Sequence, residues 1–156
     1  MLSQKTKYAL KAVFRLAREG GRGPLMISEI ARSDRIPKKF LELILLDLKN
    51  HGILHSKKGR GGGYSLAKSP SAISIGSIVR ITEGPLALLP CVSVTAYRKC
   101  DECPDENACG IRLVMKQVRD ETARILDGTT VADVLERIKN GISPSAALEE
   151  PSEFLL

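Results

Sequence analysis

The chain contains 156 residues, and its 24 Lys and Arg against 18 Asp and Glu give a formal net charge of +6. A hydrophobic content of 43% and a charged content of 27% are typical of a globular domain and exclude wholesale disorder. Aromatic residues reach only 4%, which argues against a large β-sandwich, and no apolar run is long enough to span a membrane. The first residues carry charges throughout and do not resemble a secretory signal, so we expect a soluble cytoplasmic protein with no membrane partner.

The charge is unevenly distributed along the chain. Residues 1–68 hold 15 basic and 5 acidic residues, a net charge of +10, whereas residues 69–156 hold 9 basic and 13 acidic residues, a net charge of −4. A basic half is typical of a segment that contacts a polyanion. Two solvated surfaces of opposite charge would give the same counts, so the motifs have to decide between these interpretations.

The first predicted helix covers residues 3–18. Ser3 is a suitable N-cap, and the glycine-rich segment at 20–24, which ends in a proline, stops the helix. Apolar side chains at helical spacing predict one buried face. That face consists of Ala9, Ala12, Val13, Leu16 and Ala17.

Two further helices are expected in quick succession. After a short extended piece at 25–27, Ser28 is expected to cap a helix over 29–34. Pro37 suits the first turn of a third helix, which runs to about residue 51. Two helices joined by a tight turn predict a helix-turn-helix. The side chains expected to be buried are Ile30, Ala31, Phe40, Leu41, Ile44, Leu45 and Leu48.

A hairpin is predicted next, because strand-like runs at 53–58 and 64–67 flank a glycine cluster at 59–63. A helix-turn-helix followed by a basic hairpin is a winged helix. Periodicity alone would also permit a generic helical domain, but the order of the elements favours the winged helix. A further helix capped by Ser74 is expected to run to about residue 83.

The remaining chain is predicted to form a loop, a long helix and a short helix. Residues 86–109 show no periodicity and carry all four cysteines, which predicts a functional loop. A helix over 111–127 follows, and Thr130 with Asp133 forms a capping-box-like start for a last helix to about residue 140. Alternating spacings of four and three predict a coiled-coil dimerisation seam of Ile111, Met115, Val118, Thr122 and Ile125.

The predicted fold is therefore mainly α with a small β-hairpin, a winged helix-turn-helix plus a long dimerisation helix. We divide the chain into a DNA-binding domain (1–83), a cysteine-bearing sensor loop (84–109), the dimerisation and last helices (110–140) and a flexible tail (141–156).

The basic N-terminal half predicts a DNA interface, because a binder has to neutralise phosphates spread along the duplex. Residues at the start of a recognition helix reach base edges. Glu42 is expected there either to accept from a cytosine amino group or to pair with a neighbouring lysine. Arg60, at the edge of the glycine run, suits a minor groove. The candidate DNA-binding residues are Lys5, Lys7, Tyr8, Lys38, Lys39, Phe40, Glu42, Lys57, Lys58, Arg60 and Gly61.

The cysteines follow the spacing Cys91-x8-Cys100-x2-Cys103-x5-Cys109. Structural disulfides are not expected in a cytoplasmic protein, and buried structural cysteines are usually scattered through a core. The clustering therefore indicates a metal or redox role. The spacing does not distinguish zinc from an iron–sulfur cluster, and reversible thiol oxidation remains a third interpretation.

Several segments together resemble the IscR/NsrR family of bacterial winged-helix transcription regulators, which also includes RirA and CymR. They are the start at 7–10, the segments at 30–36 and 40–42, the GRGGGY wing at 59–64, the segment at 75–84 and the junction at 126–133. The resemblance covers about residues 1–140. The wing and the KYAL start are specific in combination.

The resemblance implies a homodimer held by the long helix, a double-stranded DNA operator with dyad symmetry, and a cofactor in the loop before that helix. Many members bind a [2Fe-2S] or [4Fe-4S] cluster through three cysteines, and members without these cysteines bind none. By order and position, the three would be Cys91, Cys103 and Cys109. Two departures stand out, because Cys91 lies further upstream than is typical and Cys100 is additional. Cys100 is thus an uncertain fourth ligand, a replacement ligand or a spare thiol.

We therefore expect a dimeric transcription regulator, most simply a repressor, that senses iron, nitric oxide or redox state through an iron–sulfur cluster. The main alternative keeps DNA binding but uses zinc or a thiol switch with no cluster, as in a cysteine-metabolism regulator. A small redox protein would leave the basic half and the winged helix unexplained. No His–Cys or paired-carboxylate constellation supports an enzyme active site.

Overall fold

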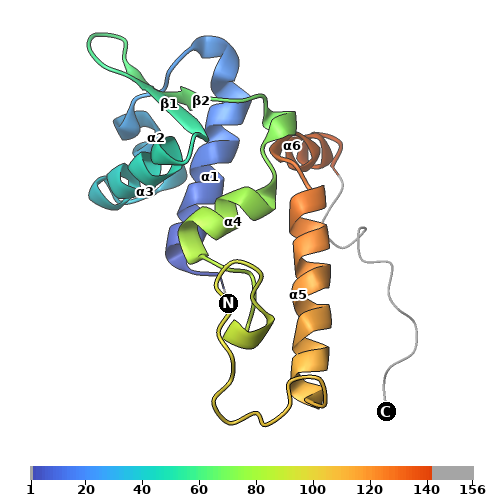
Figure 1. The fold of residues 1–156 in the computed structure, drawn as a ribbon. Helices are drawn as coiled ribbons and strands as arrows, with labels where there is room; N and C mark the ends of the chain where they lie inside the picture. Colours follow the sequence, from blue (N-terminus) through green and yellow to red (C-terminus); the bar gives the residue numbers. More distant parts are fainter. Residues whose placement is uncertain (1, 142–156) are drawn as a thin grey trace.

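The computed structural model describes residues 2–141, arranged as a helical body with a hairpin at one end and a long helix on one side (Figure 1). Helix α1 (Gln4–Glu19) begins as predicted, because the Ser3 side chain accepts a hydrogen bond from the Thr6 amide. A 3₁₀ turn at Gly20–Arg22 follows it. The predicted tail at 141–156 lies, apart from Gly141, outside the described residues.

The helix-turn-helix consists of α2 (Ile27–Asp34) and α3 (Lys38–Asn50). The prediction that Ser28 caps α2 is wrong, since the helix already begins at Ile27. The reason is that Glu29 accepts a hydrogen bond from the Met26 amide at 2.9 Å, which satisfies a free amide at an earlier residue. Arg35 adopts a left-handed conformation, with φ of 54°, and turns the chain into α3.

The wing is an antiparallel hairpin of β1 (Leu54–Lys57) and β2 (Gly63–Leu66), in which Leu54 pairs with Leu66 and Lys57 with Gly63. Leu25 adds a short third edge, because its backbone exchanges hydrogen bonds of 2.9 and 2.8 Å with Tyr64. The predicted winged helix is therefore present, and the helix-turn-helix is joined to its wing by backbone pairing.

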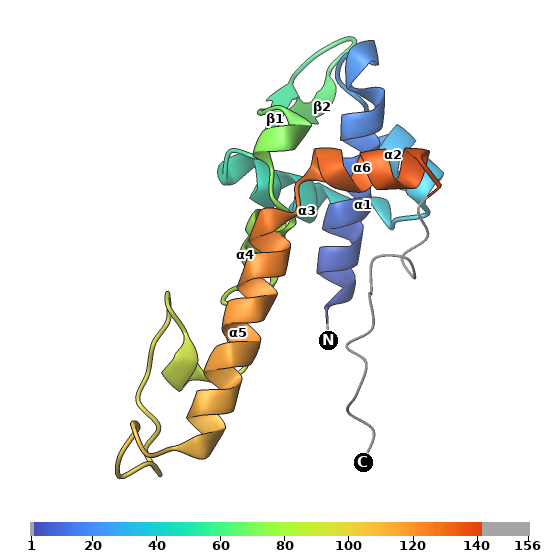
Figure 2. The ribbon, with the colours of Figure 1, turned by 90° about the vertical axis from the view of Figure 1, so that its right-hand side faces the viewer.

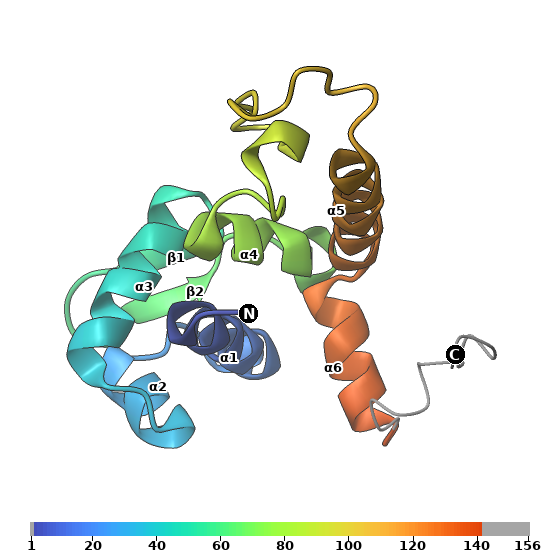
Figure 3. The ribbon, with the colours of Figure 1, turned by 90° about the horizontal axis from the view of Figure 1, so that it is seen from below.

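Helix α4 (Ile75–Glu83) is capped by Ser74 as predicted, and a 3₁₀ turn at Pro90–Val92 is the only regular element described between α4 and α5 (Gly110–Gly128). Figure 2 shows α5 projecting away from the body beside α4. Helix α6 (Val131–Lys139) turns back towards α1 and begins with the predicted capping box of Thr130 and Asp133. Seen from below, α1 lies in the middle of the body, with α3 on one side, α6 on the other and α4 above it (Figure 3).

One apolar core lies between α1, α2, α3, α4, the hairpin and the start of α6. Phe40, Ala31 and Ala17, which the sequence placed in the core, are only half-buried and pack against its edge. Among the described residues, no helix combines the length and hydrophobicity needed to cross a bilayer. The described residues with an exposed fraction of 0% are Thr6, Ala9, Ala12, Val13, Ile30, Leu41, Ile44, Leu45, Leu48, Ile78 and Val131.

Candidate DNA interface and cysteine loop

The outer face of α3 carries the side chains predicted to approach bases. Lys38, Lys39 and Glu42 are all exposed. Within residues 2–141, Glu42 forms no ion pair, so the structure does not contain the intrahelical pair that was the alternative for this carboxylate. The carboxylate is therefore free to accept a hydrogen bond from a ligand.

Two predicted DNA contacts on α1 also join α1 to α3. Lys5 donates to Asp47 of α3 at 2.7 Å. The Tyr8 ring meets the edge of Phe40, with ring centroids 5.8 Å apart and an interplanar angle of 76°. Both contacts hold α3 against α1, whereas Lys7 is exposed.

The tip of the wing presents Lys57, Lys58, Arg60 and Gly61 to solvent. The adjoining glycines are required by the chain itself. A Cβ on Gly62 would lie 2.3 Å from the Lys57 carbonyl oxygen, and one on Gly63 would lie 2.2 Å from the Leu25 carbonyl oxygen. The glycine run therefore packs closely against backbone of the same chain, and it shapes the loop that exposes Arg60.

The four cysteines differ in their surroundings. Cys91 is buried in the 3₁₀ turn, Cys100 is exposed, and Cys103 and Cys109 are half-buried. Cys109 is the N-cap of α5, where its sulfur accepts from the Arg112 amide at 3.5 Å. That hydrogen bond, with desolvation opposing it, lowers the pKa of Cys109, whereas desolvation and a hydrogen bond with Cys109 raise the pKa of Cys103.

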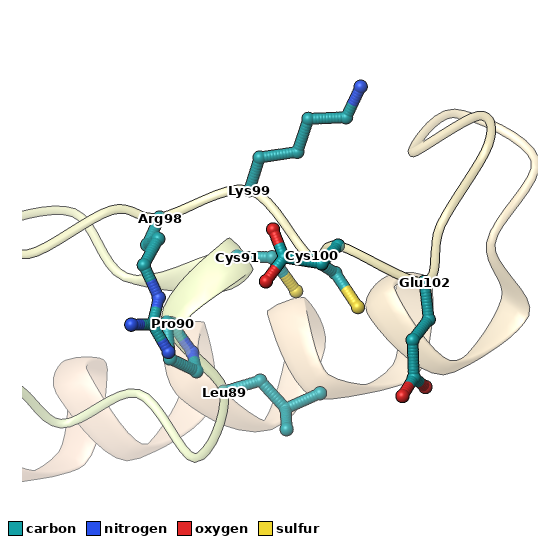
Figure 4. A pocket seen from close by; sticks show the side chains of 8 residues that line it. Leu89, Pro90, Cys91, Arg98, Lys99, Cys100 and Glu102 are labelled. Atoms are coloured by element: carbon teal, nitrogen blue, oxygen red, sulfur yellow. The ribbon is translucent and has the colours of Figure 1, made fainter.

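Two hollows in the cysteine loop, residues 84–109, share one thiol. Cys91 and Cys100 line the first, together with Arg98 and Glu102 (Figure 4). Cys100 also lines the second, together with Cys103 and Cys109. The additional cysteine therefore lines the hollow of the buried thiol as well as the hollow of the other two cysteines.

The donor set suits a soft metal or an iron–sulfur cluster, since four thiols lie in one loop. However, the described residues contain no group of three His, Cys, Asp or Glu arranged to hold a metal ion. Figure 4 shows the sulfurs of Cys91 and Cys100 both reaching into the first hollow. Bringing three thiols to one centre would require the loop to close.

Two arginines of α5, which the sequence analysis did not single out, hold the turn that carries Cys91. Arg112 donates from Nε to the Cys91 carbonyl oxygen at 3.3 Å, and Arg119 donates from Nη1 to the Val92 carbonyl oxygen at 2.5 Å. Their spacing of seven places them on one helix face. In the sequence, the only sign of this role is that two arginines lie beside the apolar seam.

The predicted seam on α5 is largely uncovered in the single chain. Ile111 is 67% exposed, Val118 39% and Ile125 56%, whereas Met115 and Thr122 are half-buried. Helix α5 contains no buried residue. An apolar stripe of this length in water indicates a protein contact.

Helix α4, which precedes the cysteine loop, is joined to α1 and to α5 by polar side chains. Glu83, at the end of α4, accepts hydrogen bonds from the Ser3 amide at 2.6 Å and from the Thr6 hydroxyl at 2.5 Å. These bonds lower the pKa of Glu83 to about 2. Arg80 of α4 donates to both carboxylate oxygens of Asp127 on α5, at 2.5 and 2.8 Å.

Comparison with known proteins agrees with this architecture. Residues 2–137 match the family model of Rrf2, described as an iron-dependent transcriptional regulator. The chain belongs to the Rrf2 family. An rrf2-like HTH-type transcriptional regulator of Rhodobacter capsulatus is 49% identical over 138 residues, which cover 86% of this chain and 92% of the relative.

Two solved Rrf2-type structures are close in shape. One is CymR, the global cysteine regulator of Bacillus subtilis, at a TM-score of 0.72 and 30% identity, covering 87% of this chain and 96% of that one. The other is IscR of T. potens, at a TM-score of 0.73 and 26% identity, covering 92% of this chain and 91% of that one. The winged-helix fold, the family resemblance and the regulator rather than enzyme class are confirmed. The printed descriptions differ in the signal that they name, since the family model is described as iron-dependent and CymR as a cysteine regulator.

Proposed function

We propose that this Rrf2-family regulator is a cytoplasmic homodimeric repressor whose affinity for a dyad-symmetric operator is set by an iron–sulfur cluster in the cysteine loop. The observation that carries the proposal is the position of the cysteines. All four lie in the one loop that connects the winged helix to α5. A change at these thiols is therefore a change in the connection between the DNA-binding domain and the proposed dimer helix.

Cys91, Cys103 and Cys109 are the proposed ligands, with Cys100 as a fourth. Cys100 supports a shared centre because it lines both hollows. When bound, a cluster supplies iron whose occupancy and oxidation state change with the iron supply, nitric oxide or redox state of the cell. The chain itself contributes a stretch between 92 and 110 that contains no helix or strand, so no regular element holds the thiols apart.

The proposed dimer buries the stripe of Ile111, Val118 and Ile125 against a second copy. Two copies related by a two-fold axis present two α3 helices. Half-sites of an operator lie about one helical turn apart, or ~34 Å, so the relative placement of the two bodies decides whether both helices reach the groove. The dyad of the proposed operator follows from this symmetry.

Residues of the chain provide a physical route from the loop to the DNA face. Arg112 and Arg119 join the Cys91 turn to α5, and the Arg80–Asp127 pair joins α5 to α4. Glu83 then joins α4 to the N-terminus of α1. We infer that loop closure shifts the population of dimers in which the two α3 helices have operator spacing.

The test is anaerobic purification followed by visible absorption, iron and sulfide assays and gel shifts on the DNA upstream of the gene. We expect a coloured protein whose iron is lost in the Cys91→Ala, Cys103→Ala and Cys109→Ala variants. Cys100→Ala then decides the role of the fourth thiol. A colourless protein that contains one zinc per chain would overturn the cluster.

The second candidate is a regulator that uses zinc or a thiol switch. It is favoured by the hollow that Cys103 and Cys109 line together and by the similarity to CymR. Native mass spectrometry before and after peroxide treatment distinguishes the two cases. A bound zinc adds its mass, whereas a thiol switch loses two hydrogens or gains oxygen.

A further inference from the structure

Two leucines stand out on the outer face of α3. Leu43 is 62% exposed and Leu46 is 46% exposed. The other aliphatic side chains of this helix are fully buried, with an exposed fraction of 0%, and they supply its contact with the core. Those buried residues are Leu41, Ile44, Leu45 and Leu48.

Leu43 has no packing role that explains it. A single exposed leucine is unremarkable, but this one belongs to an outer face that it shares with Lys39, four residues before it, and Leu46, three residues after it. Charged side chains surround it, since Lys38, Lys39 and Glu42 are exposed on the same helix, and the two lysines suit phosphates. An apolar side chain among them contributes nothing to phosphate binding.

One feature of the major groove matches such a side chain. Thymine carries a C5-methyl group there, and apolar side chains recognise it by contact. We propose that Leu43 reads a thymine methyl in each operator half-site. The proposal rests on the sequence-specific DNA binding of the proposed function and names one of the bases that it recognises.

The position along the helix favours Leu43 over Leu46. Residues near the N-terminus of a recognition helix contact base edges, and Leu46 lies about one turn further towards the C-terminus. Glu42 is adjacent to Leu43. Of the two partners predicted for it, a cytosine amino group or a neighbouring lysine, the lysine pair does not form within residues 2–141. Neighbouring helix residues reach neighbouring base steps, so the thymine is expected within one or two base pairs of that cytosine.

The charge of the surroundings favours DNA over a protein partner. Lys38 and Lys39 flank the leucines on α3, and the wing brings Lys57, Lys58 and Arg60 to the same domain, all of them exposed. A surface with this many exposed cations complements a polyanion. A second copy of the chain carries the same positive charge on this face and would be repelled.

The experiment selects binding duplexes from a random library and then replaces each thymine of the selected site, one at a time, by deoxyuridine, which lacks only the methyl group. For the unaltered protein we expect one thymine per half-site at which the replacement weakens binding about fourfold, the value of one buried methyl. Leu43→Ala should bind both duplexes equally, and Leu46→Ala should retain the discrimination. Leu43→Gln should move the preference at that base pair towards adenine.

Four results would overturn the assignment. Sequence-selective binding that is indifferent to every deoxyuridine leaves the regulator intact but removes the thymine contact. Discrimination that persists in Leu43→Ala assigns the contact to another residue. A change in the oligomeric state of Leu43→Ala, measured by light scattering, assigns the leucine to a protein interface. If the library yields no preferred sequence, the proposed function fails together with the inference.

Discussion

In residues 2–83 every α-helix buries apolar side chains, whereas α5, the main element of residues 84–128, buries none. Between 84 and 128 the buried apolar residues are Cys91 and Val92, both in the turn that Arg112 and Arg119 hold. The first region is therefore a completed core. The second is stabilised in the single chain by polar contacts, and its apolar surface is available for a second copy.

The substitution with the largest expected effect disrupts only the second region, residues 84–128. Val118→Glu places a carboxylate in the middle of the apolar stripe, so the dimer should dissociate and operator affinity should fall about a hundredfold or more, because two linked half-site contacts become one. Light scattering and gel shifts measure both changes, and circular dichroism should show an intact winged helix.

Leu113→Glu is the matched control for that variant. Leu113 is 60% exposed on the same helix, but helical spacing places it on the side opposite the stripe. It should leave the dimer unchanged. Equal dissociation by both variants would contradict a specific seam, and a monomer that has lost its helical signal would contradict an independent first region.

Substitutions in the wing, which belongs to the first region, should have the next largest effect on operator binding. Arg60→Ala should weaken operator binding about tenfold and Lys57→Ala about two- to threefold, since Arg60 is at the wing tip suited to a narrow minor groove and Lys57 is placed for a phosphate. Fluorescence anisotropy over a range of salt concentrations measures both. Equal losses with unchanged sequence preference would make Arg60 a phosphate contact only.

The link between the regions is tested by Arg119→Ala. Removing the donor to the Val92 carbonyl oxygen should leave DNA affinity of the metal-free protein within about twofold while reducing its response to iron and sulfide reconstitution. An effector typically changes the affinity at a coupled site about 5- to 150-fold, and we expect Arg119→Ala to lose most of this change in DNA affinity. Arg124→Ala is the control, because Arg124 bonds to Glu121 of its own helix. A full response in Arg119→Ala would show that the link runs elsewhere.

The first region was predictable because its signals are local. The N-caps at Ser3 and Ser74, the hairpin around the glycine cluster and the apolar periodicity of α1 and α3 each depend on residues a few positions apart. The start of α2 was missed because Ser28 and Met26 compete for the cap, and Glu29 decides between them.

The second region was less predictable because its contacts join residues far apart in the chain. Arg119 contacts Val92 and Arg80 contacts Asp127, and neither pair has a spacing that a sequence pattern could reveal. The cysteine spacing identified the candidate site, but it did not show that Cys100 lines both hollows. The apolar stripe of α5 was visible as a period, since periodicity does not depend on what covers it.

The smallest effect concerns Glu83, at the border of the two regions, and it depends on pH. Its folded-state pKa of about 2 is below the unfolded value of about 4.3, so its contribution to stability is complete above pH 4.3 and is lost as the pH falls through 2. The difference in unfolding midpoint between the unaltered protein and Glu83→Gln should therefore shrink steadily over that interval, in thermal melts followed by circular dichroism.

Glu136→Gln, at an exposed position on α6, is the control for Glu83→Gln, because it removes a carboxylate that does not contact Ser3 or Thr6. A constant difference for Glu83→Gln would mean that Ser3 and Thr6 do not favour the ionised carboxylate. A steady decrease would mean that the carboxylate that ends α4 is coupled to the start of α1. Because the cysteine loop begins at the next residue, that coupling fixes the end of α4 from which the loop departs.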